Sequence, residues 1–87
     1  MNELMERAAR LWLTNRKEIL SNKRHRYINN ARHAFVLLAL LSGYSREKIA
    51  EFTGWTLYRV DYYAGKAISD EEVLSRMKQK GVLSIEV

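Results

Sequence analysis

Residues 45–66 read SREKIAEFTGWTLYRVDYYAGK, and this stretch decides the expected fold. Two short amphipathic segments flank Gly54. Ser45 and Thr56 stand just before these segments, where a side-chain oxygen can cap the first free N–H groups of a helix. Gly54 can adopt the positive φ of a tight turn, which costs other residues strain. The pattern predicts two consecutive helices joined by a short turn.

The spacing within residues 46–66 matches the helix-turn-helix template. Its fourth, fifth, ninth, fifteenth and eighteenth places are occupied by Ile49, Ala50, Gly54, Val60 and Tyr63. In this motif a small residue lies where the two helices touch, and the larger apolar residues face the core and fix the crossing angle. The second helix then enters the DNA major groove. An ordinary α-hairpin is the alternative interpretation.

In that geometry the helix at 57–67 presents its outward face to DNA. Arg59 is expected to read guanine, and Leu57 or Tyr58 to meet a thymine methyl group. Hydroxyl and ammonium groups on the same side suit phosphates. The contacts expected from this half of the chain are Ser45, Arg46, Thr56, Leu57, Tyr58, Arg59, Tyr62 and Lys66. Exposed tyrosines would equally fit a protein-contact surface.

Positive charge is concentrated in the first third of the chain. The 87 residues carry 15 Lys and Arg against 10 Asp and Glu, for a net charge of +5. Residues 7–32 contain eight basic side chains and a single acid, Glu18. A basic loop can reach phosphates or a minor groove. The expected contacts from this basic surface are Lys23, Arg24, Arg26 and Arg32, although a solvated helix face is an alternative.

The remaining segments complete an all-α domain of about five helices that spans residues 1–87. Apolar spacing predicts a first helix from Asn2 to about Leu20. A second helix is expected over about residues 28–42, and its second half, residues 35–41, is apolar nearly all round, which is typical of a central helix covered on most sides. A last helix is expected to begin at a Ser69 cap and end at Gly81. The tail at 82–87 alternates apolar and polar residues and is expected to be extended, with pairing across a homodimer as one option.

Two stretches resemble the DNA-binding domain of DnaA, the bacterial replication initiator. They are residues 21–34, SNKRHRYINNARHA, and residues 40–54, LLSGYSREKIAEFTG. The resemblance covers about residues 10–80. It implies a helical domain that binds duplex DNA, with Lys23, Arg24 and Arg26 at the minor groove or backbone and the helix-turn-helix in the major groove.

The start of the second helix departs from that family. The family's hallmark is Asp-His-Thr-Thr-Val, whereas residues 56–60 read TLYRV, with spacing one residue shorter and only the valine shared. A DNA site other than the initiator's own is therefore expected. The chain lacks an ATPase portion, so a small regulator of transcription or replication, from a phage or mobile element, is the expected class.

Several function classes are disfavoured by composition. The chain has no cysteine, which excludes a thiol nucleophile and a zinc finger. His25 and His33 are the only histidines and have no neighbouring carboxylate in the sequence, so they make a poor metal site. The four glycines are isolated rather than clustered in a phosphate loop. We expect no enzyme activity, no metal and no cofactor.

The expected location and partners follow from the same residues. The longest apolar run, 34–41, is far shorter than the roughly 20 residues a bilayer requires. With no signal peptide at the N-terminus, a cytoplasmic protein without membrane contact is expected. Duplex DNA is the expected partner. The alternatives are a replication or transcription protein bound through Tyr58, Tyr62, Tyr63 and the tail, and single-stranded nucleic acid stacked on the tyrosines.

Overall fold

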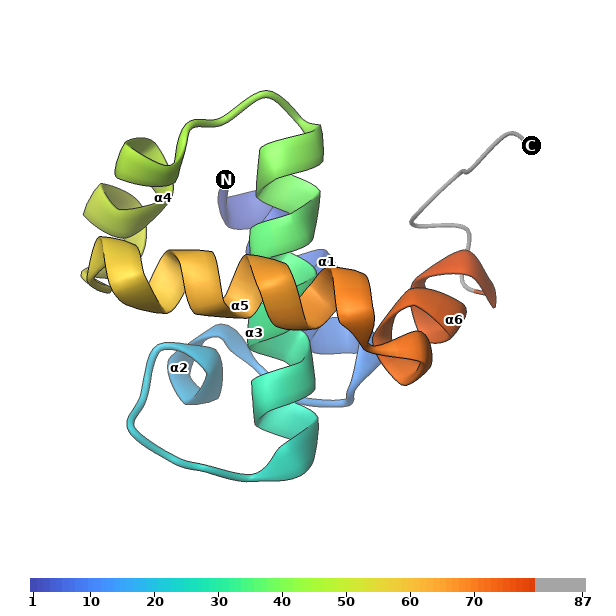
Figure 1. The fold of residues 1–87 in the computed structure, drawn as a ribbon. Helices are drawn as coiled ribbons and strands as arrows, with labels where there is room; N and C mark the ends of the chain where they lie inside the picture. The colour runs from blue at the N-terminus through green and yellow to red at the C-terminus, as the bar shows by residue number, and fades with distance from the viewer. Residues whose placement is uncertain (80–87) are drawn as a thin grey trace.

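Six helices occupy residues 1–79, the part of the chain that the computed structural model describes (Figure 1). In chain order they are α1 (Asn2–Leu11), α2 (Arg16–Ile19), α3 (Arg26–Leu41), α4 (Arg46–Thr53), α5 (Leu57–Ser69) and α6 (Glu71–Gln79). No strand occurs in that range, so the all-α prediction is confirmed, with one helix more than expected. The end of the last helix at Gly81 and the tail at 82–87 lie outside the described residues.

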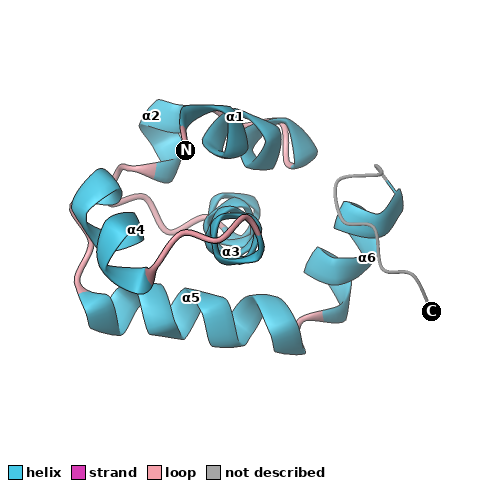
Figure 2. Ribbon diagram, turned by 90° about the horizontal axis from the view of Figure 1, so that it is seen from above, coloured by secondary structure: helices cyan, strands magenta, loops and turns pink. Residues whose placement is uncertain are grey.

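Helix α3 forms the centre of the molecule. Seen end-on, it lies between α1 on one side and α5 on the other, with α4 and α6 beside α5 (Figure 2). Every residue from Ile28 to Ala39 except Asn29 is buried. Each large apolar side chain removed from water in this way stabilises the fold by about 1.5–3 kcal/mol. The continuous apolar run thus predicted the central helix correctly.

The prediction of one helix from Asn2 to Leu20 is wrong. Helix α1 ends at Leu11, Leu13 adopts a left-handed φ of 53°, and a separate short helix, α2, follows. Asn15 is the physical reason, because its Oδ1 accepts a hydrogen bond from the backbone N–H of Glu18 at 2.9 Å. An Asn side chain that bonds to nearby backbone favours a cap over a helix interior.

Helices α4 and α5 are two consecutive helices joined by a short turn, as predicted. Ser45 accepts from the backbone N–H of Lys48 at 3.2 Å, and Thr56 accepts from that of Arg59 at 3.1 Å. Between the helices, Gly54 has a φ of +80°. Of the template positions, Ile49, Val60 and Tyr63 are buried and Ala50 is half-buried against the core.

Asp70, rather than the predicted Ser69, caps the last helix. Helix α5 continues through Ser69, whose hydroxyl donates to the carbonyl oxygen of Gly65 at 3.0 Å. The Asp70 carboxylate accepts from the backbone N–H of Glu72 at 3.0 Å. Because Ser69 is still helical within α5, whereas Asp70 has the extended backbone of an N-cap, Asp70 provides the cap.

Candidate nucleic-acid interface

A hollow of about 420 Å³ lies where the α2–α3 loop meets α5. The loop contributes Ser21, Asn22 and Arg24, α3 contributes Asn29, Arg32 and His33, and α5 contributes Tyr58, Arg59, Tyr62 and Tyr63. The basic loop and the outward side of the second helix are therefore neighbours on one side of the molecule. One partner can touch both at once.

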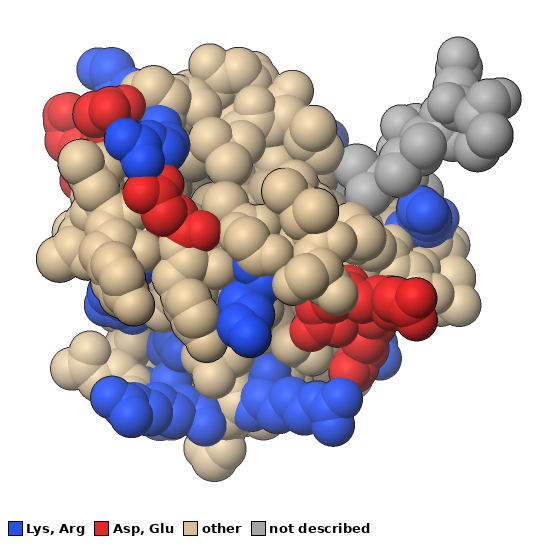
Figure 3. All heavy atoms as spheres, viewed as in Figure 1, with Lys and Arg blue, Asp and Glu red and all other residues tan. Residues whose placement is uncertain are grey.

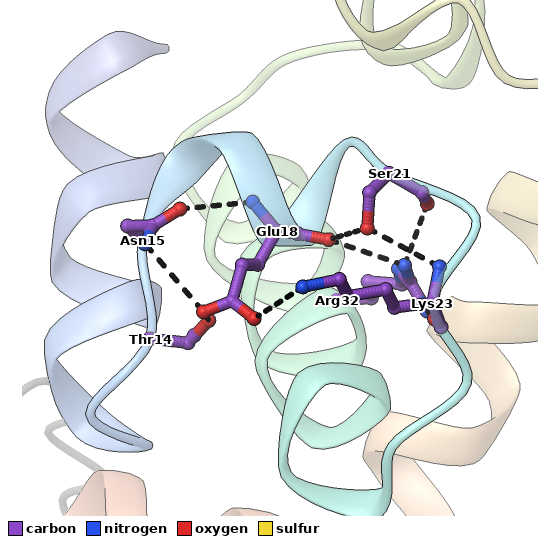
Figure 4. Close-up of polar contacts among 6 residues, drawn as sticks. All are labelled: Thr14, Asn15, Glu18, Ser21, Lys23 and Arg32. Atoms are coloured by element: carbon purple, nitrogen blue, oxygen red, sulfur yellow. Dashed lines mark hydrogen bonds and ion pairs between the residues drawn. The ribbon is translucent and has the colours of Figure 1, made fainter.

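Arg32 shapes the loop from beneath. Its side chain is 2% exposed. Its Nε donates to the carbonyl oxygen of Ile19 at 2.8 Å, and its Nη1 donates to the carbonyl oxygen of Lys23 at 2.8 Å and to Oδ1 of Asn29 at 2.6 Å. Its Nη2 donates to the carbonyl oxygens of Ser21 at 2.7 Å and Glu18 at 3.3 Å (Figure 4).

All five N–H groups of the Arg32 guanidinium are thus matched by acceptors. The prediction that Arg32 contacts DNA directly does not fit this position. The side chain is buried in α3, and a contact with phosphate would break the bonds that hold the loop. Its effect on any partner of the loop is therefore indirect.

A second small network holds the start of the loop. The Glu18 carboxylate accepts from the Thr14 hydroxyl at 3.1 Å and from Nδ2 of Asn15 at 3.5 Å, and lies 3.5 Å from Nζ of Lys23 (Figure 4). Lys23 therefore keeps its exposed position in the loop, but a nearby carboxylate offsets part of its charge.

Lys23, Arg24 and Arg26, the three cations predicted in the loop, do not form one cluster. Arg24 lines the hollow. Arg26 lies at the first residue of α3 and pairs with Glu72 of α6 at 2.5 Å, beside Trp12 and Tyr27. The structure therefore brings Arg24 together with α5 but places Arg26 next to α6.

Arg59 is held by aromatic rings at the hollow. Its guanidinium carbon lies 5.3 Å from the Trp55 ring centroid and 5.6 Å from that of Tyr63. Its Nη2 donates to the Tyr63 hydroxyl at 2.8 Å. Cation–π contact and hydrogen bonding together restrict the guanidinium to the wall of the hollow. To read a base as predicted, Arg59 would have to leave this arrangement.

The outward face of α5 carries apolar and aromatic side chains. Leu57, Tyr58 and Tyr62 are 40%, 80% and 49% exposed. Lys66 lies one turn beyond, with its Nζ 5.6 Å from the Tyr62 ring centroid. Tyr58, Tyr62 and Lys66 follow one another at four-residue spacing along one exposed stripe of α5, and Leu57 is exposed beside its first turn.

Arg46 is exposed, but an acid from the next helix engages it. Its Nη1 lies 2.5 Å from Oδ2 of Asp61. This hydrogen bond and the negative charge of Asp61 raise the pKa of Arg46 further above its ordinary value. Ser45 and Thr56, also predicted as contacts, use their hydroxyl oxygens as helix caps.

Charge is divided over the face that includes α5. Lys and Arg side chains gather below α5, over the α2–α3 loop, and acidic side chains flank them near α4 and at the start of α6 (Figure 3). Helix α1 lies across α3 from α5, and its Arg7 pairs with Glu3 at 2.9 Å (Figure 2). The basic side chains predicted to form one surface over residues 7–32 are therefore spread over more than one side of the molecule.

His33 and Asn29 belong to the hollow, although the sequence did not suggest it. His33 is 8% exposed, its ring packs 5.4 Å from that of Tyr63, and its buried Nδ1 has no partner among the described residues. Burial lowers the pKa of His33 below its ordinary value. Both residues lie within one turn of Arg32 on α3, so their closeness to a predicted site residue could have indicated that they line the hollow.

Comparisons of the chain with protein-family models, with curated proteins and with solved structures each found no match. The resemblance of residues 21–54 to the DnaA domain therefore stays a prediction. Among the described helices, none combines the length and apolar composition of a membrane span. Nor do three or more His, Asp or Glu side chains within residues 1–79 come together in a group able to hold a metal ion.

Proposed function

We propose that this domain binds duplex DNA, with α5 in the major groove and the α2–α3 loop against the neighbouring backbone. One observation carries the proposal. Arg24 of the loop and Tyr58, Arg59 and Tyr62 of α5 line the same hollow, so a single duplex can meet both elements. The proposed outcome of binding is regulation of transcription or replication at the bound site.

The proposed docking follows from the dimensions of DNA. The major groove of B-form DNA, about 12 Å wide, admits one α-helix. Helix α5 is 13 residues long, and Leu57 and Tyr58 stand exposed on its first turn. The first residues of a recognition helix are the ones that reach base edges. Apolar contact with a thymine methyl group suits both side chains.

Anisotropy of a labelled random-sequence duplex, measured over a series of salt concentrations, tests this proposal. Affinity is expected to fall with salt, because bound Lys and Arg release counterions from the phosphates. Arg24→Ala should weaken binding and reduce the slope of log affinity against log salt by about one. Arg10→Ala is the matched control, since Arg10 is an exposed residue of α1, across α3 from α5. Binding that is insensitive to salt and to Arg24→Ala contradicts the proposal.

The exposed aromatic face of α5 also favours a second candidate function, which is docking onto another protein. Tyrosine is enriched at protein interfaces, and Tyr58 and Tyr62 are exposed on consecutive turns. The anisotropy experiment separates the two candidates. Tyr58→Ala with unchanged DNA affinity but lost capture of a replication or transcription protein would favour protein docking. An excess of single-stranded competitor that displaces the duplex would instead indicate recognition of unpaired strands.

A further inference from the structure

Positive charge at the hollow is not balanced by acid. Arg24, Arg32 and Arg59 all line it, and its lining contains no Asp or Glu. Within residues 1–79, none of these three guanidiniums forms an ion pair. Arg32 is buried and Arg59 is half-buried, and a cation withdrawn from water is costly unless it is paired. The lining of the hollow therefore carries positive charge that no acidic side chain within it offsets.

The unbalanced positive charge affects Arg32, the buried arginine of the hollow. Arg32 is satisfied in hydrogen bonds, but all its acceptors are neutral carbonyl and amide oxygens. Burial, and to a smaller extent the charge of Arg59, lower the pKa of Arg32. A negative charge in the hollow would oppose both effects, because it favours the charged form of Arg32.

Donors at the hollow are left free for such an anion. Arg59 uses its Nε and Nη2 on the Tyr63 hydroxyl, which leaves Nη1 without a partner among the described residues. Nδ2 of Asn29 makes no hydrogen bond in that range either, while its Oδ1 accepts from Arg32. His33 also lines the hollow and is 8% exposed; its Nδ1, which is itself buried, has no partner among the described residues.

We propose that the hollow between the α2–α3 loop and α5 is a phosphate-binding site. Guanidinium groups present a planar fork of donors that fits phosphate oxygens, and two of them, Arg24 from the loop and Arg59 from α5, line the hollow. Arg59 thereby contacts phosphate rather than a base. Its contribution to DNA affinity is then the same for every sequence.

The source of the phosphate rests on the proposed function. With α5 in the major groove and the loop against the neighbouring backbone, the sugar-phosphate strand at the edge of the groove runs along the seam between the two elements. That seam is the hollow, so the bound group is a backbone phosphodiester. The same chemistry would also accept a free phosphate or a mononucleotide, and the experiment distinguishes these sources.

The first arm uses the free protein. Nitrogen-labelled protein is titrated with sodium phosphate, with sodium chloride at matched ionic strength, and with a mononucleotide, and followed by NMR. Phosphate is expected to shift the Arg59 side-chain Nε–H and the His33 ring signals, and chloride is not. Arg59→Gln should abolish the His33 shift, while Arg10→Gln, a matched change on α1, should retain it. Shifts that are equal in phosphate and chloride overturn the site.

The second arm uses two duplexes of unrelated sequence. Arg59→Gln should lower affinity for both by the same factor, about tenfold, and reduce the salt slope by about 0.9. Arg59→Lys, which keeps the charge but not the fork, should restore the slope and only part of the affinity. A loss confined to one duplex overturns the phosphate role of Arg59 and leaves duplex binding intact. Phosphate-specific shifts without any duplex binding would support the site, assign it to a free phosphate or nucleotide, and contradict the proposed function.

Discussion

Nη1 of Arg32 donates to the carbonyl oxygen of Lys23 at 2.8 Å, which ties the central helix to the loop that carries Arg24. The other four N–H groups of the same guanidinium bind acceptors between residues 18 and 29. The shape of the loop, and hence the position of Arg24 beside α5, therefore depends on one buried side chain.

Arg32→Lys is expected to lower the free energy of unfolding by about 2 kcal/mol or more, because an ammonium has three donors where the guanidinium has five. Urea unfolding followed by circular dichroism measures this. Arg10→Lys, at an exposed position on α1, should change stability by less than about 0.5 kcal/mol. Equal stability of the Arg32→Lys variant and the unaltered protein would show that the loop is held by other contacts.

Gly54→Ala and Gly65→Ala are expected to change stability in opposite directions. A Cβ added at either glycine meets nothing within 4 Å, so backbone conformation alone decides. At Gly54, where φ is +80°, alanine should cost about 1–2 kcal/mol. Gly65 lies inside α5, where alanine should add about 0.5–1 kcal/mol. Thermal unfolding of both variants checks the pair, and a stabilised Gly54→Ala would contradict the turn geometry.

The fold was largely predictable because local signals agreed with the packing. Gly54 needed a positive φ, Ser45 and Thr56 offered caps, and the apolar run in α3 required cover on all sides. The first helix was predicted wrongly because apolar spacing continues past Leu11. That spacing does not reveal that Asn15 accepts from the backbone N–H of Glu18 and so begins a new helix.

Asp61→Asn is expected to raise affinity for duplex DNA by about three- to tenfold at low salt. The change removes a negative charge from the outward side of α5. It also frees Arg46, whose Nη1 lies 2.5 Å from Oδ2 of Asp61. Anisotropy at two salt concentrations measures the gain. Glu6→Gln makes the same charge change on α1 and should have little effect. A loss of affinity in Asp61→Asn would mean that the carboxylate positions Arg46 or accepts from a base.

The protein is expected to become less stable as the pH is lowered, because of His33. Burial lowers its pKa below the ordinary 6.5, more than nearby Asp70 raises it. The unfolded chain then binds a proton near pH 6.5 while the folded protein stays neutral at this residue. The stabilisation is fully present above about pH 6.5 and is lost as pH falls toward the folded-state pKa. Urea unfolding at pH 7.5 and pH 5.5 measures the loss.

His33→Gln supplies the control for that pH dependence, because glutamine is uncharged at both values. The difference in unfolding free energy between pH 7.5 and pH 5.5 should shrink in this variant. A difference as large as that of the unaltered protein would assign the effect to the carboxylates instead.

The candidate site was less predictable than the fold. Charge in the sequence marked residues 7–32 as one surface, but pairing and burial depend on contacts between distant segments. Glu72 of α6 engages Arg26, and the interior of α3 takes Arg32. The burial of Arg32 could have been predicted from the sequence, since it stands four residues after Ile28 and three before Phe35, on the same face of the buried helix. The proximity of Arg24 to Arg59 required the tertiary fold, because they are 35 positions apart in the sequence.

The most direct test is an NMR titration of the labelled protein with a short duplex. Amide shifts are expected to appear together in loop residues 21–25 and along α5, with the exposed side of α1 unchanged. Shifts in only one of these two elements, or shifts centred on α1, would mean that the loop and α5 do not grip the same double helix.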